Sequence, residues 1–273
     1  MKSTPKVSVV MSTYNRCQDL PKTVASIEEQ NYQNLEIIIV NDSSVDGTRK
    51  FLQKLSQDPK FVIINNIKNK GLQASLNIGI HKASGKYIAR IDDHDIWIDN
   101  EKISKQIFFL EHNPKIGLLG TSYMTNGKVF SNPLSDKGIR RQMLFRCPYC
   151  HVSVVFPKKI WEELGGYNES LRYAEDWEFW LRIGQHYKLA NLSDTTVKVE
   201  DSDDGLSKKY YLKQLPQIRK ITKDLKMSYD LYFLSIVYHN LVAAFFKVFP
   251  PNGLMQKLMH RVFRLVFFKS NDQ

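Results

Sequence analysis

Short apolar runs rich in β-branched residues alternate with amphipathic helical stripes over the first hundred residues. After the run Val7–Met11, the residues Leu20, Val24 and Ile27 recur at the i, i+4, i+7 spacing of one helix face, behind Asp19, a residue type that caps helices. Further apolar runs are residues 35–40, 61–64 and 87–91, and further helices are expected at 49–55 and from residue 71. Near-continuous apolar strands separated by helices predict an α/β fold with a mostly parallel sheet and helices on both faces.

Polar residues directly follow three of these strands, at positions 13–16, 42–46 and 92–95. The carboxyl ends of parallel strands lie at one edge of a sheet, and ligands of open α/β sheets bind at that edge. Three polar clusters at the same edge are hard to explain as independent turns. The sequence therefore predicts a binding site built from these three loops.

Asp92, Asp93, His94 and Asp95 crowd three carboxylates and an imidazole into four positions. Like charges this close raise one another's pKa, so a divalent cation would relieve the repulsion. Carboxylate oxygens with one imidazole nitrogen suit Mn²⁺ or Mg²⁺, whereas structural zinc prefers thiolates and several imidazoles. The residues alone leave a second interpretation open, a solvated acidic turn before a helix that begins near Asn100.

The second half of the chain has a more mixed pattern. A helical stripe of Ile103, Ile107 and Leu110 predicts a helix, and the apolar runs at 116–121 and 151–156 predict strands. Between them, Asn126-Gly127 is a dipeptide favoured in tight hairpin turns. This part of the chain is expected to complete the same α/β domain.

Glu175 and Asp176 precede a helical face formed by Trp177, Trp180, Leu181 and Gly184. The dipole at the start of a helix favours negative charge. On the residues alone, the pair is therefore a helix cap rather than a catalytic pair.

The charge of the chain is concentrated in its tail. Residues 206–273 contain twelve Lys or Arg against three acids, a net charge of +9, whereas residues 1–205 carry only +2. Residues 231–249 are apolar but interrupted by Ser235, His239, Asn240 and Lys247, so a membrane-spanning helix is not expected.

A basic helical stripe near the end of the tail points to an anionic membrane surface. Its members are Lys257, His260, Arg261 and Arg264, and apolar residues fill the rest of this helix. A helix docked on the main domain is the alternative. Nucleic acid is a poorer match for the tail, because its aromatic residues resemble a buried or lipid-facing surface rather than a stacking platform.

The three cysteines are too few for a disulfide framework and indicate a reducing compartment. Cys147 and Cys150 have the spacing of half a zinc or redox site, but no second pair completes it. Residues 1–6 lead into the first strand without an apolar signal-like region. We therefore expect a cytoplasmic protein.

Four ordered blocks resemble glycosyltransferase family 2, whose members have the GT-A fold. The blocks are residues 7–16, 37–48, 71–80 and 85–97, and the similarity extends over residues 7–185. The resemblance implies a GT-A catalytic domain over residues 1–205, with a nucleotide-sugar-binding half at about 1–98 and an acceptor half at about 99–205. Residues 206–273 would form a basic, helical appendage.

The resemblance also implies roles for the three loops. Thr13, Tyr14 and Arg16 would line the nucleotide pocket, and Asp42 would bond the uracil edge. Asp92 and Asp93 would hold the ribose and the metal-bound diphosphate, with Asp93, His94 and Asp95 as ligands of Mn²⁺ or Mg²⁺.

The sequence departs from the family pattern at two positions. His94 stands where family members have a carboxylate, and Leu76 stands where they often have an arginine. Neutral imidazole is a competent Mn²⁺ ligand. The first departure puts the identity and affinity of the metal in question, and the second removes one expected phosphate contact.

By the same resemblance, Asp176 would be the general base and Glu175 its neighbour. His151 and Trp177 would face the acceptor, although a buried, hydrogen-bonded histidine is an alternative for His151. The implied reaction moves a sugar from a UDP-sugar to a hydroxyl of a glycan or lipid-linked glycan, with inversion, in polysaccharide or lipopolysaccharide biosynthesis.

The enzyme would work as a peripheral protein at the inner face of the cell membrane. Because His94 replaces a carboxylate, a nonenzymatic, membrane-associated sugar-nucleotide-binding protein is the alternative function.

Overall fold

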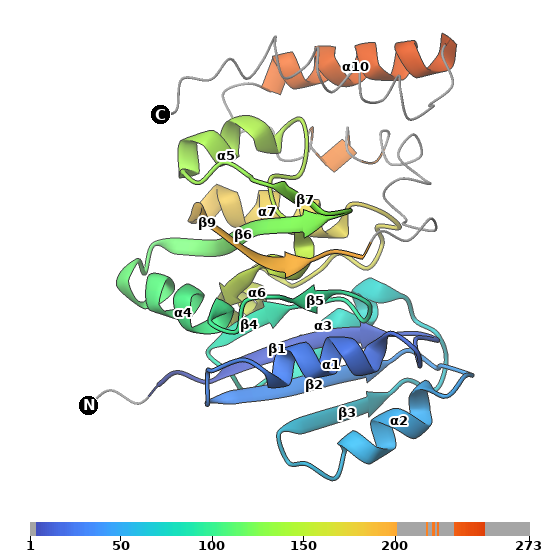
Figure 1. The fold of residues 1–273 in the computed structure, drawn as a ribbon. Helices are drawn as coiled ribbons and strands as arrows, with labels where there is room; N and C mark the ends of the chain where they lie inside the picture. Colours follow the sequence, from blue (N-terminus) through green and yellow to red (C-terminus); the bar gives the residue numbers. More distant parts are fainter. Residues whose placement is uncertain (1–3, 201–216, 218–219, 222, 224–231, 249–273) are drawn as a thin grey trace.

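The computed structural model describes residues 4–200, 217, 220, 221, 223 and 232–248. Its first part confirms the expected alternation of strands and helices (Figure 1). The elements are β1 (Val7–Thr13), α1 (Leu20–Glu28), β2 (Leu35–Asn41), α2 (Thr48–Leu55), β3 (Phe61–Asn65), α3 (Leu72–Lys82) and β4 (Tyr87–Arg90). β1 lies between β2 and β4, β2 also pairs with β3, and all three pairings are parallel.

The second part extends the same sheet with strands of both directions. Its elements are β5 (Ile96–Trp97), α4 (Lys102–His112), β6 (Ile116–Thr125), β7 (Lys128–Phe130), α5 (Asp136–Met143), the 3₁₀ turn η1 (His151–Ser153), β8 (Val155–Pro157), α6 (Lys158–Leu164), α7 (Glu175–His186), β9 (Lys188–Lys198) and α10 (Tyr232–Val248). The strand order is β3-β2-β1-β4-β8-β6-β9-β5, with β7 on β6. β8 runs antiparallel to β4 and β6, whereas β9 runs parallel to β6.

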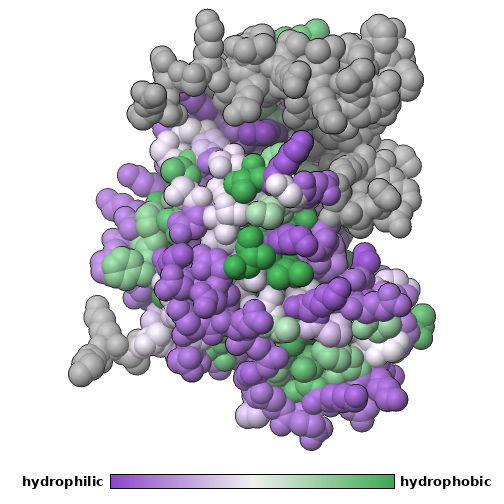
Figure 2. Space-filling model, viewed as in Figure 1, coloured by the Kyte–Doolittle hydropathy of each residue, from purple (hydrophilic) through white to green (hydrophobic). Residues whose placement is uncertain are grey.

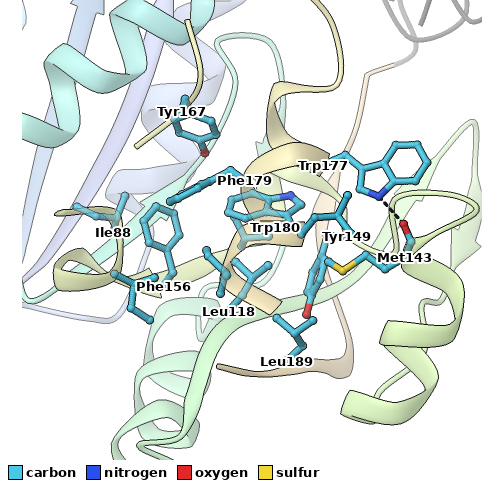
Figure 3. Packing of buried hydrophobic residues seen from close by; sticks show 14 of the residues in the cluster. Ile88, Leu118, Met143, Tyr149, Phe156, Tyr167, Trp177, Phe179, Trp180 and Leu189 are labelled. Carbon is cyan, nitrogen blue, oxygen red and sulfur yellow. Dashed lines mark hydrogen bonds between the residues drawn. The ribbon is translucent and has the colours of Figure 1, made fainter. Parts of the chain in front are cut away.

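Two apolar cores lie on the two faces of the sheet, as expected for near-continuous apolar strands. One core joins Val10, Ile38 and Ile88 to α3, α5, α6 and α7, and the other joins Val9 and Ile37 to α1, α2 and α4. The helical face of Trp177, Trp180, Leu181 and Gly184 is buried in the first core, as its spacing predicts. Figure 3 shows Trp180 packed among Phe179, Phe156 and Tyr149.

Three local predictions meet different outcomes. Asn126 and Gly127 both have positive φ in the turn between β6 and β7, so the hairpin is confirmed. Asp19 precedes α1, but its carboxylate lies 3.5 Å from the Arg16 guanidinium and makes no capping hydrogen bond. The strand expected from His151 is wrong for its first residues, because the Ser153 amide and hydroxyl both donate to Cys150 O and close a 3₁₀ turn.

Within the appendage, α10 is docked on the main domain. Ser235, His239 and Val242 are buried, and the Tyr238 ring meets Phe145 edge-on at 5.6 Å. None of the helices in the described part of the chain has the length and apolarity to cross a bilayer. The basic stripe predicted at residues 257–264 lies outside the described residues.

The surface on the face seen in Figure 2 is mainly hydrophilic, with apolar residues in separate patches. The large apolar side chains that stay exposed include Phe108, Val129, Phe130 and Leu134. The cysteines Cys147 and Cys150 are free, partly buried thiols, and burial raises the pKa of both. Thiols whose pKa is raised in this way are poor nucleophiles and poor metal ligands.

Candidate active site

The loops after β1 and β2 are tied to one another by four hydrogen bonds. The Asn15 amide donates to Ser44 Oγ and the Val45 amide to Asn15 Oδ1, at 3.0 and 2.8 Å. The Arg16 amide donates to Thr48 Oγ1, and the Cys17 amide to Asp46 Oδ2, at 3.0 and 3.1 Å. Asn15 and Ser43 have positive φ, a backbone conformation that residues other than glycine rarely adopt. The two loops therefore form one rigid rim at the carboxyl edge of the sheet.

The first polar loop meets Asp93 at this edge. The Tyr14 amide donates to Asp93 Oδ2 at 3.3 Å, and Arg16 Nε lies 3.9 Å from Asp93 Oδ1. Thr13 Oγ1 is buried without a hydrogen-bond partner among the described residues. Buried hydroxyls are normally satisfied, so Thr13 Oγ1 is free to bond a ligand or water. The structure thus brings Thr13, Tyr14, Arg16 and Asp93 together, and their contact with a donor stays a prediction.

Asp42 ties the end of β2 to the segment between β3 and α3. Its Oδ1 accepts from Asn66 Nδ2 and from the Lys70 amide at 2.7 and 2.9 Å, and its Oδ2 accepts from the Gly71 amide at 2.8 Å. Gly71 has a φ of 88°, which only glycine adopts at little cost. The Asp42 carboxylate is therefore largely occupied by its own chain, and a bond to uracil stays a prediction.

Arg90 is a central residue that the sequence reasoning did not single out. Its side chain is fully buried, and its Nη1 donates to Val10 O and Ile91 O at 2.9 and 2.6 Å. Its Nη2 donates to Asp92 Oδ1 at 2.5 Å, and its Nε donates to His151 Nε2 at 3.2 Å. Burial opposes ionisation of Asp92, but Arg90 outweighs it and lowers the pKa of Asp92. The available signal was an arginine inside an apolar strand, directly before the carboxylate cluster.

The four residues expected to hold a metal divide into separate contacts. His94 Nδ1 lies 3.1 Å from Asp93 Oδ1, and that hydrogen bond raises the pKa of His94 to about 9. Asp95 Oδ1 instead accepts from the Glu200 amide at 3.0 Å, and burial raises the pKa of Asp95 to about 7. Within the described residues, no three His, Cys, Asp or Glu side chains gather around one point. Asp93, His94 and Asp95 therefore form no common cluster in this part of the chain, and their binding of a metal stays a prediction.

Asp93 and His94 nevertheless fit one kind of metal site. Mg²⁺ bound beside phosphates commonly takes only one or two side chains, and the substrate supplies further oxygens. A cation bound to His94 must displace the proton that His94 shares with Asp93. The residues present suit a cation that arrives with a diphosphate rather than one held by the protein alone.

Glu175 and Asp176 are the first two residues of α7. Ala174, directly before them, has φ 57° and ψ 30° in the left-handed region, and the Trp177 amide donates to Asp176 Oδ1 at 2.7 Å. Burial, followed by the charge of Asp176, raises the pKa of Glu175 to about 7. Burial also raises the pKa of Asp176, and the charge of Asp92 adds to this. Two clusters far apart in the sequence thus lie within electrostatic reach of one another.

His151 lies between these two clusters. Its Nε2 is 3.2 Å from Arg90 Nε and 3.1 Å from the Tyr167 hydroxyl. Burial and the charge of Arg90 lower the pKa of His151 to about 3. The alternative of a hydrogen-bonded histidine is therefore present in the structure, and contact with an acceptor stays a prediction.

Trp177 faces the core rather than an open pocket. Its indole N–H donates to Met143 O of α5 at 2.6 Å (Figure 3). The residue is buried, and this bond joins α7 to α5. Leu76, where the family often has an arginine, is likewise fully buried in the first core. A role for Trp177 toward the acceptor stays a prediction.

The comparisons with known proteins identify one family. Residues 8–163 match the model of glycosyl transferase family 2. An uncharacterized glycosyltransferase of Haemophilus influenzae is 34% identical over 240 residues, which cover 82% of this chain and 74% of that protein. The amylovoran biosynthesis glycosyltransferase AmsE of Erwinia amylovora is 31% identical, over 83% of this chain and 91% of AmsE.

A further relative has a named reaction. It is the UDP-Glc:alpha-D-GlcNAc-diphosphoundecaprenol beta-1,3-glucosyltransferase WfaP of Escherichia coli, which is 28% identical over 92% of this chain and 94% of WfaP. All three relatives are similar over most of their own length.

Solved structures share the fold at low identity. Staphylococcus aureus TarS 1–349 in complex with UDP has a TM-score of 0.66 at 18% identity, over 83% of this chain and 67% of that chain. The mannosyltransferase PcManGT of Pyrobaculum calidifontis, in complex with GDP-Man and Mn²⁺, has a TM-score of 0.65 at 15% identity, over 98% and 82%. Because the family model matches more than half of the chain, this chain is a glycosyltransferase of family 2 with the GT-A fold.

Proposed function

We propose that this glycosyltransferase moves a hexose from a UDP-sugar to a hydroxyl of a glycan or lipid-linked glycan, with inversion, in the synthesis of a surface polysaccharide or lipopolysaccharide. One observation carries the proposal. The carboxylates that begin α7 lie within electrostatic reach of Asp92, at the sheet edge where nucleotides bind in open α/β folds. A base for an acceptor hydroxyl would therefore lie close to the loop that is expected to hold the donor.

Asp176 is the proposed general base. Its raised pKa makes its ionised form a stronger base than an ordinary aspartate, and the Trp177 amide orients the carboxylate. As Asp176 takes the proton of an acceptor hydroxyl, that oxygen bonds to the anomeric carbon while the bond from this carbon to the diphosphate oxygen breaks. Attack on the side opposite the departing UDP inverts the anomeric centre.

The donor side binds and orients the UDP-sugar. Thr13, Tyr14 and Arg16 would line the nucleotide. The guanidinium group of Arg16, which lies beside Asp93, would contact the diphosphate. Asp93 and His94 would hold Mn²⁺ or Mg²⁺ together with diphosphate oxygens, and such a cation neutralises charge on the leaving group when bound. Arg90, which donates to Asp92, would keep that carboxylate oriented for contact with the donor.

The names of the relatives support the substrate classes. WfaP is named for UDP-Glc and for an acceptor GlcNAc on diphosphoundecaprenol, AmsE is named for amylovoran biosynthesis, and TarS has been solved with UDP. A UDP-sugar and a lipid-linked glycan are therefore the first substrates to test.

The test is a transfer assay with UDP-Glc and other UDP-hexoses, using a GlcNAc-diphosphate lipid as acceptor. The anomeric protons of the product report the linkage by NMR. We expect a β-linked product from the α-configured donor, and a lower rate when a chelator replaces Mn²⁺ or Mg²⁺. A product that keeps the α configuration would exclude inversion. UDP binding without transfer from any donor would favour the nonenzymatic sugar-nucleotide-binding protein instead.

We also propose that the enzyme is peripheral at the inner face of the cell membrane. The net charge of +9 over residues 206–273 supports attraction to anionic lipid. Flotation of the enzyme with vesicles that contain the acceptor tests this. Anionic vesicles should bind the enzyme, and they should release it as added salt screens the charges. Equal flotation with neutral and anionic vesicles would contradict the proposal.

A further inference from the structure

The His151 imidazole is held in one orientation by three neighbours. The Trp180 ring lies 5.9 Å from it at 69° and the Tyr167 ring 5.8 Å from it at 62°, both edge-to-face. Arg90 Nε and the Tyr167 hydroxyl both approach its Nε2. Arg90 comes from β4, Tyr167 precedes α7, and Trp180 belongs to α7. The ring therefore cannot turn over without losing contacts to both halves of the sheet.

Arg90 determines which ring nitrogen carries the proton. A guanidinium N–H can only donate, so Nε2 must be the accepting nitrogen of the pair. Burial and the charge of Arg90 keep the ring neutral by lowering the pKa of His151 to about 3. A neutral imidazole has one N–H, which is therefore on Nδ1. No residue in the described part of the chain hydrogen-bonds this Nδ1.

This arrangement gives His151 a donor and removes it as a base. The lone pair of Nε2 is taken by Arg90, and Nδ1 carries a proton, so neither nitrogen can accept the proton of an acceptor hydroxyl. His151 is also only half-buried, unlike the fully buried Arg90 behind it. The unused N–H is the one polar group that the ring can offer to a ligand.

His151 packs against the helix that carries the proposed base. Its neighbour Trp180 lies four residues after Asp176 in α7. The charges of Asp176 and Glu175 also reach its partner Tyr167, whose pKa is raised first by burial and further by these charges. Its partner Arg90 is paired with Asp92 on the donor side. A sugar hydroxyl presented to Asp176 would thus have His151 nearby, and an N–H donor orients an oxygen without competing for its proton.

On the basis of the proposed function, we infer that His151 donates its Nδ1–H to an oxygen of the acceptor sugar and that Arg90 is the positioning residue that fixes this tautomer. His151 is then a specificity-determining residue for the acceptor. It makes no contribution to donor binding.

Two substitutions at His151 separate the two ring nitrogens. In His151→Asn the amide group lies near the position of Nδ1, whereas in His151→Gln it lies near the position of Nε2. With UDP-Glc and a GlcNAc-diphosphate lipid, we expect His151→Asn to keep the acceptor KM within about 3-fold of wild type. We expect His151→Gln to raise the acceptor KM by about 10-fold, which is the effect of losing one hydrogen bond. The Kd for UDP should stay the same in both variants.

Equal losses in the two variants, a smaller loss in His151→Gln, or a changed Kd for UDP would overturn the inference. If the wild type transfers no sugar while it binds UDP, the proposed function fails, and the tautomer is still tested by ¹⁵N NMR of the histidine ring. We expect a protonated Nδ1 and a bare Nε2, both in the wild type and in Tyr167→Phe, which keeps Arg90. A protonated Nε2 in the wild type, or a changed tautomer in Tyr167→Phe, would overturn the role of Arg90.

Discussion

Ala174 carries the backbone strain that directs the two carboxylates of α7. Its φ of 57° lies in the left-handed region, where a side chain other than that of glycine or asparagine costs on the order of 1 kcal/mol or more. Glu175 and Asp176 follow immediately, so the strained residue sets the entry angle of the helix at the proposed base. Strain of this kind persists only where the surrounding packing holds it, and Ala174 packs against the first core.

Substitutions at Ala174 test this assignment. Ala174→Gly should keep the free energy of unfolding within about 1 kcal/mol of wild type, because relief of strain offsets the lost methyl contact and the looser unfolded chain. Ala174→Val should lower it by about 2 kcal/mol or more and slow transfer, because a β-branched residue is a severe outlier at positive φ. Urea unfolding and the transfer rate measure both effects. A valine variant as stable and active as wild type would show that the backbone here is not strained.

Single residues differ in how far the sequence could predict them. Glu175 and Asp176 were placed correctly at a helix start, because the signal is local: acids before a regular apolar face. Arg90 was missed, because its partners Val10 and His151 come from distant segments and its burial shows only in the fold. The contact of Asp95 could not be predicted either, because the Glu200 amide that donates to its Oδ1 lies far along the chain, and a metal role for Asp95 stays a prediction.

At the level of elements, Glu36 of β2 joins its strand to two other segments, residues 6–8 and the turn at Ser84, at the amino-terminal edge of the sheet. Its carboxylate accepts from the Ser8 hydroxyl of β1, from the Ser84 amide and hydroxyl at 2.7 and 2.8 Å, and from Lys6 Nζ at 2.8 Å. Gly85 is required beside it, because a Cβ there would lie 2.6 Å from the Ser8 amide. This network fixes the turn between α3 and β4, and so the start of the strand that carries Arg90.

Glu36→Gln should destabilise the fold in a pH-dependent way. Burial alone would raise the pKa of Glu36, but the hydrogen bonds from Lys6, Ser8 and Ser84 outweigh it and hold the pKa at about 2. Because this value is below that of an unfolded glutamate, the contribution is complete above about pH 4.5 and is lost as the pH falls toward 2. At neutral pH we expect Glu36→Gln to lose about 2 to 3 kcal/mol of unfolding free energy.

Denaturant unfolding at several pH values measures this contribution, with Glu29→Gln as the control, because Glu29 is an exposed residue directly after α1. The difference between wild type and Glu36→Gln should shrink in acid, whereas Glu29→Gln should follow the wild type throughout. A difference that stays constant from neutral pH to about pH 2 would contradict an ionised Glu36 as the source.

Elements with a regular apolar period were predictable, and those defined by pairing were not. β1 to β4 and the helices between them follow from local patterns. β5 has two residues and exists only because Ile96 and Trp97 pair with β9. The turn at 151–153 replaces an expected strand because the Ser153 hydroxyl donates a hydrogen bond to Cys150 O. Strand direction beyond β4 depends on how distant segments meet, and no local pattern specifies it.

The whole molecule is organised around contacts that cross from the first part of the sheet to the second. β8 joins β4 to β6, so one sheet runs through both parts. Asn77 of α3 holds the segment before α7, since its Nδ2 donates to Tyr167 O at 2.8 Å and its Oδ1 accepts from the Tyr167 amide at 2.9 Å. Arg90 and His151 make the second crossing. The division into donor and acceptor halves near residue 98 stays a prediction.

These crossings make the position of Asp176 relative to Asp92 the central claim about function, and Asp176→Asn tests it most directly. We expect turnover with UDP-Glc to fall by about 10² to 10⁴, the usual contribution of a general base, while the Kd for UDP changes by less than about 2-fold. Asp194→Asn, which removes a carboxylate paired with Lys105, is the control and should behave as the wild type. Unchanged turnover in Asp176→Asn would remove Asp176 from the mechanism, and a parallel loss of UDP binding would show that the residue is structural.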